Sequence, residues 1–166
     1  MEIGKIVGFT GTRRGMLSRQ RQSIEVLLKL LQPKEVHHGD CVGADEQFHR
    51  IAQDLGLRII IHPPDNPKLQ AQCMIDNERS FRLFPRPYMD RNRDIVMASD
   101  IVLAAPAEEE VQRSGTWMTV RTAKGMSKHV IVVYPEGYLE FRDYSQPVSM
   151  FKGRSHLGGD GDVGDI

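Results

Sequence analysis

Short apolar runs alternate with helical patterns along most of this chain. The runs have the length of β-strands and contain many β-branched residues, and they lie at 3–9, 35–38, 57–61, 100–105 and 130–134. Between them, apolar residues recur at helical spacing over 18–33, 43–55, 90–99 and 116–124. Strands that alternate with helices indicate βαβ units, a parallel sheet and right-handed crossovers. We therefore expect an α/β fold, with an open, doubly wound parallel sheet of about five strands and helices on both faces.

The composition is that of an ordinary single domain, which we expect over residues 1–150. The chain has 166 residues, and its 22 Lys and Arg residues balance its 22 Asp and Glu residues. A chain with no net charge has no general attraction for nucleic acid or for an anionic membrane. No apolar stretch approaches the roughly 20 residues of a membrane span, and the N-terminus lacks the pattern of a signal peptide. We expect a cytoplasmic protein.

Two segments fall outside the alternating pattern. Residues 63–89 form a long, proline-rich insertion in which we expect only a short helix, over about 69–78, and loops of this length are usually functional or mobile. Residues 151–166 are rich in Gly and Asp and are predicted to form a flexible tail. The tail lacks the spacing of an EF-hand, so it does not indicate a calcium site.

The most informative loop is Gly8–Gly15, which follows the first predicted strand and precedes a predicted helix. Its glycines let backbone N–H groups approach an anion closely, and Thr10 and Thr12 add hydroxyl donors. Arg13 and Arg14 add positive charge. A strand, a loop of this kind and a helix N-terminus together form a cradle for phosphate. An ordinary turn with Gly and Thr is the alternative.

The second loop, His38–Asp45, follows the second predicted strand. Gly39 and Gly43 permit close backbone approach, and Asp45 lies in the first turn of the next helix. Asp45 either caps that helix and favours its dipole, or accepts a hydrogen bond from a ribose hydroxyl.

The histidines and cysteines do not form a metal-binding pattern. His37 and His38 are adjacent without an evident third ligand, so we interpret them as structural. Cys41 and Cys73 stand far apart without a Cys-x-x-Cys partner, which indicates neither a zinc site nor a disulfide framework. We predict no metal and no cofactor.

The third loop, Ser114–Thr116, follows the fourth predicted strand and opens a helix. Its free N–H groups and the Ser114 and Thr116 hydroxyls would form a second anion cradle, although a Ser N-cap is the ordinary alternative. The carboxyl ends of parallel strands lie at one edge of a sheet, so we expect this cradle to lie opposite the loop 10–13.

Charged residues flank the predicted site. Arg91 and Asn92 begin a helix, and a cation there opposes the helix dipole unless an anionic ligand, or the neighbouring Asp90 and Asp94, compensates it. Three glutamates, 108–110, follow the fourth strand, either as a solvated charge run or with one carboxylate facing the ligand.

Five motifs, taken in order, resemble those of the SLOG superfamily. They are Gly11-Thr12-Arg13, His38-Gly39-Asp40-Cys41-Val42-Gly43-Ala44-Asp45, Arg91-Asn92, Asp100 with the strand that follows it, and Ser114-Gly115-Thr116. The resemblance spans about residues 5–135. This superfamily includes the Lonely Guy phosphoribohydrolases and the DNA-processing protein DprA, and the pattern here is most similar to that of its small bacterial and phage members of uncharacterised function. The resemblance implies a Rossmann-like fold, a nucleotide or nucleotide-derived ligand, and a homodimer.

The three loops and this resemblance together give the predicted ligand-binding residues. They are Thr10, Gly11, Thr12, Arg13, Gly39, Asp40, Gly43, Asp45, Arg91, Asn92, Ser114, Gly115 and Thr116. We expect the phosphate on the loop 11–13 and the helix start 114–116, held by Arg91, with ribose hydroxyls near Asp45.

One departure from the superfamily bears on catalysis. In the phosphoribohydrolases, a Pro-Gly-Gly-x-Gly-Thr-x-x-Glu motif holds the phosphate and supplies a carboxylate that helps to cleave the base–ribose bond. Here Gly115 and Thr116 match, but Thr119 stands at the Glu position and 112–114 reads Gln-Arg-Ser. We therefore expect a nucleotide-binding or nucleotide-sensing module and assign no catalytic residue.

Two other functions remain as alternatives. The first is an N-glycosidase acting on nucleoside 5′-monophosphates, with Asp45 or Glu110 as a substitute carboxylate. The second is binding of single-stranded DNA, which the neutral net charge disfavours.

Overall fold

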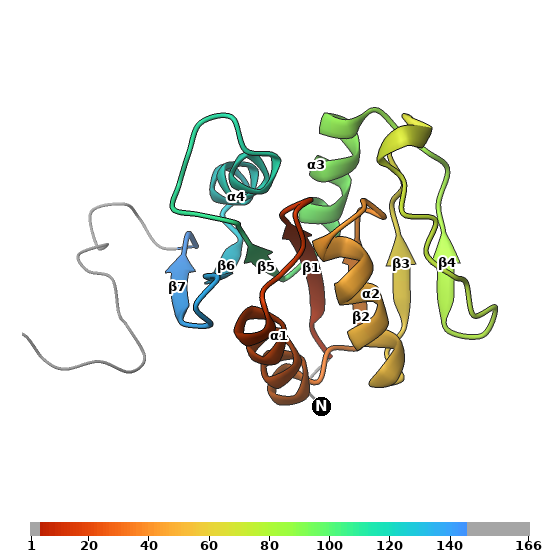
Figure 1. Cartoon of the computed structure of the whole chain (residues 1–166), viewed down its shortest axis with the longest axis horizontal. Coiled ribbons are helices and arrows are strands. Elements are labelled where there is room, and N and C mark those ends of the chain that lie inside the picture. The colour runs from red at the N-terminus through yellow and green to blue at the C-terminus, as the bar shows by residue number, and fades with distance from the viewer. Residues whose placement is uncertain (1–3, 146–166) are drawn as a thin grey trace, which may run out of the picture.

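Seven strands form one sheet in the computed structural model, which describes residues 4–145 (Figure 1). Their order is β4-β3-β2-β1-β5-β6-β7, and all neighbours pair in parallel except β6 and β7. The strands are β1 Ile6–Gly11, β2 Glu35–His38, β3 Ile59–Ile61, β4 Ser80–Arg82, β5 Ile101–Ala105, β6 His129–Val133 and β7 Leu139–Asp143.

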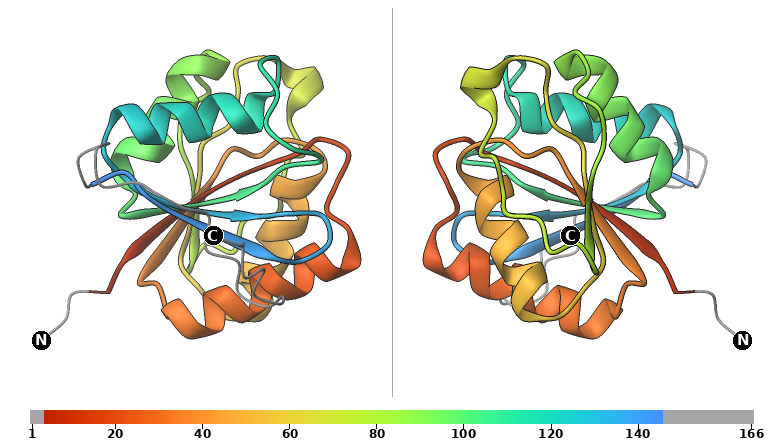
Figure 2. Two further views of the ribbon diagram at one scale, coloured as in Figure 1. Left: turned by 90° about the vertical axis from the view of Figure 1, so that its left-hand side faces the viewer. Right: turned by 90° about the vertical axis from the view of Figure 1, so that its right-hand side faces the viewer.

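Helices cover both faces of the sheet, as expected for a doubly wound fold. Figure 2 shows α1 and α2 together on one face, and α3 and α4 together on the other. The helices are α1 Ser18–Leu31, α2 Ala44–Asp54, α3 Tyr88–Ala98 and α4 Gly115–Gly125. Connections that run in opposite directions from the centre of the sheet place two helices on each face.

The alternation of side chains along the strands divides the core into two layers. On the α1/α2 face, Val7 and Phe9 are buried, and the Phe9 ring stacks on Phe48 of α2 with centroids 4.2 Å apart. On the α4 face, Val102 packs with the fully buried Trp117. Burial of large apolar side chains on both faces is the main stabilising contribution to such a fold.

The sheet has seven strands, so the expectation of about five was wrong. β4 has only three residues and lies inside the proline-rich segment, where no periodicity marks it. β7 follows a tight turn in which Gly137 has φ of 92°, and it pairs antiparallel with β6 as an edge strand. Only Glu140 of its five residues is buried, so its sequence carries a weaker signal than the continuous apolar runs of the central strands.

The predicted helix over 69–78 is also wrong. Only a 3₁₀ turn forms, at Pro67–Leu69, and the chain then runs across the end of the sheet. Backbone N–H groups of this segment bond to Asp40 instead: Ala71 donates to its carbonyl at 2.7 Å and Cys73 to its carboxylate at 2.9 Å. These long-range bonds replace the local bonds of a helix.

None of the helices within residues 4–145 is long and apolar enough to span a membrane. The predicted tail, 151–166, lies outside the described residues. The domain limits of 1–150 and the cytoplasmic location stay predictions.

The strand order fixes where a ligand site can form. β1 and β5 are neighbours at the centre of the sheet, and their connections lead to opposite faces. The loops that leave their carboxyl ends therefore diverge and leave a crevice between them, which is where ligands bind in open α/β sheets.

The packing of the core predicts that two leucines of α1 contribute very differently to the free energy of unfolding. Leu28 is 1% exposed and Leu30 is 75% exposed. Leu28→Ala should lower the free energy of unfolding by about 2–5 kcal/mol, because it leaves a cavity, whereas Leu30→Ala should change it by less than about 0.5 kcal/mol. Urea unfolding of the two variants measures this difference, and equal losses would contradict the assigned packing of α1.

Candidate functional site

A cavity of about 310 Å³ lies between the loop after β1 and the loop that connects β5 to α4. The Thr12 N–H donates to the Ala105 carbonyl at 3.0 Å, which extends the β1–β5 pairing to the mouth of this cavity. Thirteen residues line it: Gly11, Thr12, Arg13, Arg14, Tyr88, Ala107, Glu108, Val111, Arg113, Ser114, Gly115, Thr116 and Trp117. Two loops about a hundred residues apart in the chain thus face one space, as the positions of the strand ends predict.

Positive charge predominates in this cavity. Arg13, Arg14 and Arg113 line it, and none of them has an ion pair within residues 4–145. Glu108 is the one carboxylate among its lining residues. Unpaired arginines that converge on a space between loops favour an anionic ligand there.

The N-terminus of α4 opens into the same cavity. The Ser114 hydroxyl caps the helix by accepting from the Trp117 N–H at 3.3 Å. The N–H groups of Gly115 and Thr116 have no hydrogen-bond partner in the described part of the chain. They add two donors and the positive end of the helix dipole to the charge of the arginines.

A second, smaller chamber of about 20 Å³ lies behind this cavity and shares Gly11, Arg13 and Tyr88 with it. It receives the predicted site residues Thr10, Gly39, Asp45, Arg91 and Asn92. A space of this size holds about one water molecule, so a sugar does not fit beside Asp45 in this conformation.

Arg91 is the buried cation of the inner chamber. It is 2% exposed, and its guanidinium donates to the carbonyls of Gly39 and His62 and contacts the Cys41 sulfur at 3.4 Å. Its Nε has no partner in the described residues. Gly39 is necessary here, because a Cβ at this position would lie 1.9 Å from Arg91 Nη1.

Asp45 organises the loop before α2. Its carboxylate accepts from the Cys41 N–H at 3.1 Å. Burial raises the pKa of Asp45 from 3.8 to about 6, and the nearby Arg91 limits this rise. Asp45 therefore serves the backbone of the loop rather than the N-terminus of α2, where Gly43 is the N-cap residue.

Tyr88 separates the two chambers. Its ring lies between two guanidinium groups, with Arg13 Cζ 5.5 Å and Arg91 Cζ 5.0 Å from the ring centre. Its hydroxyl lies against α4, since a Cβ on Gly115 would come within 1.9 Å of it. The start of α3 is thereby fitted against both the first loop and the third.

Two predicted site residues line neither chamber. Asp40 holds the segment after β3 through the Cys73 N–H, and its other carboxylate oxygen has no partner in the described residues. Gly43 has φ of 94°, and a Cβ there would lie 2.3 Å from the Arg13 carbonyl oxygen. Both residues support the loops without facing the space.

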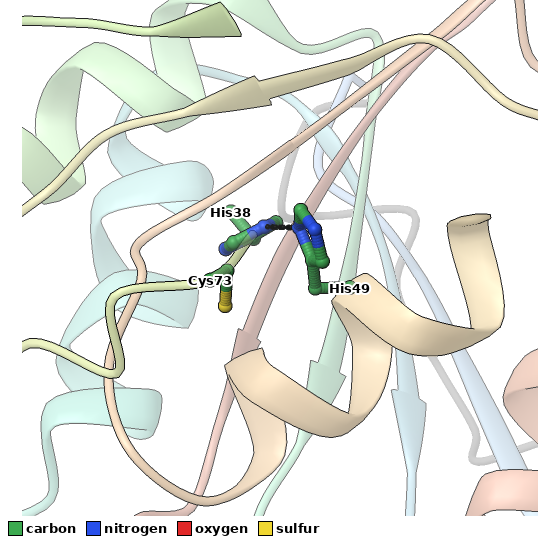
Figure 3. A group of neighbouring side chains, drawn as sticks. All are labelled: His38, His49 and Cys73. Carbon is green, nitrogen blue, oxygen red and sulfur yellow. Dashed lines mark hydrogen bonds between the residues drawn. The ribbon is translucent and has the colours of Figure 1, made fainter. Parts of the chain in front are cut away.

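His38, His49 and Cys73 bring three metal-ligating atoms within 4.8 Å of one another (Figure 3). The Asp40 N–H donates to His38 Nδ1 at 3.0 Å, so neutral His38 carries its proton on Nε2, which lies 2.8 Å from His49 Nδ1. His49 Nε2 then donates to the Met74 carbonyl at 2.9 Å. Every ring nitrogen of the two histidines is engaged, so hydrogen bonds account for this cluster without a metal.

A second buried histidine pair lies on the other face of β2. His37 Nε2 is 2.7 Å from the Glu35 carboxylate, and its Nδ1 is 2.7 Å from His62 Nε2. Burial lowers the pKa of His37 and lowers that of His62 to about 4. These histidines therefore act as neutral structural groups at ordinary pH.

Several lining residues of the larger cavity were not among the predicted site residues. Arg14 belongs to the first loop, where its charge was noted although it was not listed as a site residue, and Arg113 immediately precedes the third loop, so adjacency and charge could have indicated it. Tyr88 lies at the end of the proline-rich segment, where the predicted helix began two residues later. Its place between two arginines depends on tertiary structure alone.

Comparisons with solved structures find the same fold at low sequence identity. The molybdenum cofactor binding protein from Rippkaea orientalis is 19% identical, with a TM-score of 0.60 over 81% of this chain and 78% of that one. The Moco carrier protein from Chlamydomonas reinhardtii is 17% identical, with a TM-score of 0.55 over 78% and 76%. DNA processing protein A from Helicobacter pylori is 18% identical, with a TM-score of 0.54 over 78% and 65%. No protein-family model and no curated protein matches the sequence.

The buried histidines predict a loss of stability in acid. The pKa of His62 is about 4 in the folded chain, whereas its ordinary value is 6.5. The unfolded chain therefore binds a proton at His62 before the folded chain does, and the free energy of unfolding falls as the pH drops from 6.5 towards 4. This one group accounts for about 3 kcal/mol. Asp45 has the opposite effect between pH 6 and 3.8, because its pKa is raised on folding.

Urea unfolding at several pH values between 7 and 4 measures how steeply the free energy of unfolding changes with pH. His62→Gln should flatten this pH dependence, whereas His129→Gln should not, because the His129 side chain is 52% exposed. Equal slopes for the wild type and the His62 variant would contradict the role of burial.

Proposed function

From the SLOG-type Rossmann-like fold of this chain, we propose that it binds a nucleotide or nucleotide-derived ligand in the cavity between β1 and β5. It acts as a binding or sensing module for a small molecule. The ligand carries a phosphate, and its remainder occupies the space walled by Tyr88, Val111 and Trp117.

One observation carries this proposal: three arginines without ion-pair partners among residues 4–145 share a cavity with the free N–H groups of a helix N-terminus. Such an arrangement leaves positive charge uncompensated at the surface of a neutral chain. A dianionic phosphate satisfies the backbone donors and neutralises part of this charge at once.

The phosphate rests on the N–H groups of Gly115 and Thr116, with Arg13 and Arg113 on either side. The oxygen of the Thr12 hydroxyl accepts a hydrogen bond from the Arg14 N–H at 3.1 Å. The hydroxyl proton stays available, so Thr12 adds a further donor to the phosphate. Arg91 acts from the inner chamber by its charge and by holding the loop after β2, rather than by direct contact.

The fold neighbours support a role in ligand binding. The proteins from Rippkaea orientalis and Chlamydomonas reinhardtii are named for binding and carrying the molybdenum cofactor. Mass spectrometry of small molecules that co-purify with this chain would identify its own ligand. A homodimer, in keeping with the superfamily resemblance, belongs to the same proposal.

Neutralising a cavity arginine should weaken nucleotide binding. Arg113→Gln and Arg13→Gln are each expected to reduce the affinity for a nucleoside 5′-monophosphate by about 10- to 100-fold, because each removes a charge-assisted contact. Calorimetric titration or thermal stabilisation by the four common ribonucleotides measures this effect. Arg21→Gln is the matched control, since Arg21 is an exposed residue of α1 outside the cavity. Unchanged affinity in both cavity variants would refute the assigned position of the phosphate.

The residue at the position of the phosphoribohydrolases' catalytic carboxylate supports binding without cleavage. Thr119 is 1% exposed, and its hydroxyl donates to the Gly115 carbonyl at 3.0 Å, so it supplies no acid. Glu110, one of the two substitute carboxylates considered, pairs with Arg121 and Arg142 and does not line the cavity.

Prolonged incubation with AMP, GMP or CMP should therefore release no free base above the uncatalysed background, as measured by liquid chromatography. Base release that Arg113→Gln abolishes would instead establish the N-glycosidase.

A further inference from the structure

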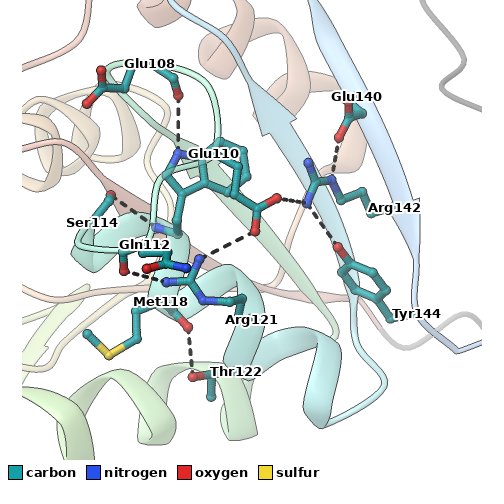
Figure 4. A network of polar contacts seen from close by, with 11 residues as sticks. Glu108, Glu110, Gln112, Ser114, Met118, Arg121, Thr122, Glu140, Arg142 and Tyr144 are labelled. Atoms are coloured by element: carbon teal, nitrogen blue, oxygen red, sulfur yellow. Dashed lines mark hydrogen bonds and ion pairs between the residues drawn. The ribbon is translucent and has the colours of Figure 1, made fainter.

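The three consecutive glutamates after β5 occupy three different environments. Glu110 lies between Arg121 and Arg142, 3.5 Å from each guanidinium (Figure 4). The Glu109 carboxylate accepts from the Tyr138 hydroxyl at 3.5 Å. Glu108 alone of the three lines the cavity. One glutamate therefore faces the space while the next two attach the loop to α4, β7 and the turn before β7.

The backbone of Glu108 is fixed by the indole of Trp117. Trp117 Nε1 donates to the Glu108 carbonyl at 3.2 Å, and the Trp117 N–H is itself bonded to the Ser114 hydroxyl. Arg142 lies over the same indole, with its Cζ 5.1 Å from the ring. The position of Glu108 is thus tied to the first turn of α4, whose N–H groups face the cavity.

The Glu108 carboxylate has no ion pair within residues 4–145, although three arginines line the same cavity. A carboxylate here weakens the attraction for phosphate, so charge alone does not explain its presence. A carboxylate has two acceptor oxygens, and a vicinal diol offers two O–H donors at matching spacing. The ligand group that benefits is one that donates hydrogen bonds.

The sugar is the hydrogen-bond-donating part of the proposed ligand that lies nearest to Glu108. The Glu108 backbone is bonded to the first turn of α4, and Glu108 lines the same cavity as the phosphate donors of Gly115 and Thr116, so its carboxylate shares the space of the proposed phosphate. In a nucleoside 5′-phosphate the ribose follows the phosphate directly, and the base lies beyond it. The inner chamber around Asp45, at about 20 Å³, is too small to take a sugar.

We propose that the Glu108 carboxylate accepts hydrogen bonds from the 2′- and 3′-hydroxyls of the ligand and makes this chain selective for ribonucleotides over 2′-deoxyribonucleotides. The proposal rests on the proposed function, because it concerns the same cavity. Glu109 and Glu110 act as positioning residues that hold the loop around Glu108.

The test compares the four ribonucleoside 5′-monophosphates with their 2′-deoxy counterparts by calorimetric titration. The wild type should bind at least one ribonucleotide about 10- to 100-fold more tightly than its deoxy counterpart, because the deoxy form lacks the 2′-hydroxyl and so loses one charge-assisted hydrogen bond to the carboxylate. Glu108→Gln should reduce this ratio to about threefold or less. Its melting temperature should stay unchanged, because the side chain is exposed.

Glu78→Gln is the matched control and should keep the ratio of the wild type, because Glu78 is an exposed glutamate that does not line the cavity. A ratio that Glu108→Gln leaves intact would overturn the proposal, as would equal binding of ribo and deoxy forms by the wild type. Loss of GMP and dGMP binding together in Glu108→Gln would overturn it in favour of contact with the base. If the wild type binds neither nucleotides nor inorganic phosphate, the proposed function fails as well.

Discussion

The parallel pairing of β1 with β5 is the constraint on which the site depends. The five paired positions from Val7–Ile101 to Gly11–Ala105 end at the mouth of the cavity, where the Thr12 N–H adds one more bond to β5. The helices that follow these two strands lie on opposite faces, so their loops must separate at this point. The arginines, the helix N-terminus and Glu108 reach a common space only because this pairing holds their loops together.

Side chains from one loop or helix pack directly against the glycine backbone of another, and these contacts hold the loops together. Gly39 admits the Arg91 guanidinium, and Gly115 admits the Tyr88 hydroxyl, at places where a Cβ would lie within 2 Å of these groups. The glycines of the motifs thus act through contacts between loops as well as through access to their own N–H groups. Asp40 also acts through contacts between segments, because it accepts from the Cys73 N–H although it lines neither chamber.

The sequence allowed the prediction of those features that depend on local pattern. Continuous apolar runs marked the central strands, and the meeting of parallel strand ends placed Thr12 and Ser114 in one crevice. β4 and β7 were not predicted, because a three-residue strand and a half-exposed edge strand carry little periodic signal. Tyr88 was missed for another reason, because its contacts with two arginines arise only from the fold. The sequence allowed one of the three glutamates 108–110 to face the ligand, but which of them lines the cavity depends on tertiary contacts such as the bond from the Trp117 indole.

Trp117 is the chain's single tryptophan, and its surroundings give it an optical consequence. The indole is fully buried in the α4 layer, yet it lines the cavity and bonds to the loop that carries Glu108. Any event that moves this loop changes the polarity around one fluorophore, and global unfolding changes it differently by exposing the ring to water. The emission spectrum of the native chain therefore reports the state of the cavity without any added label.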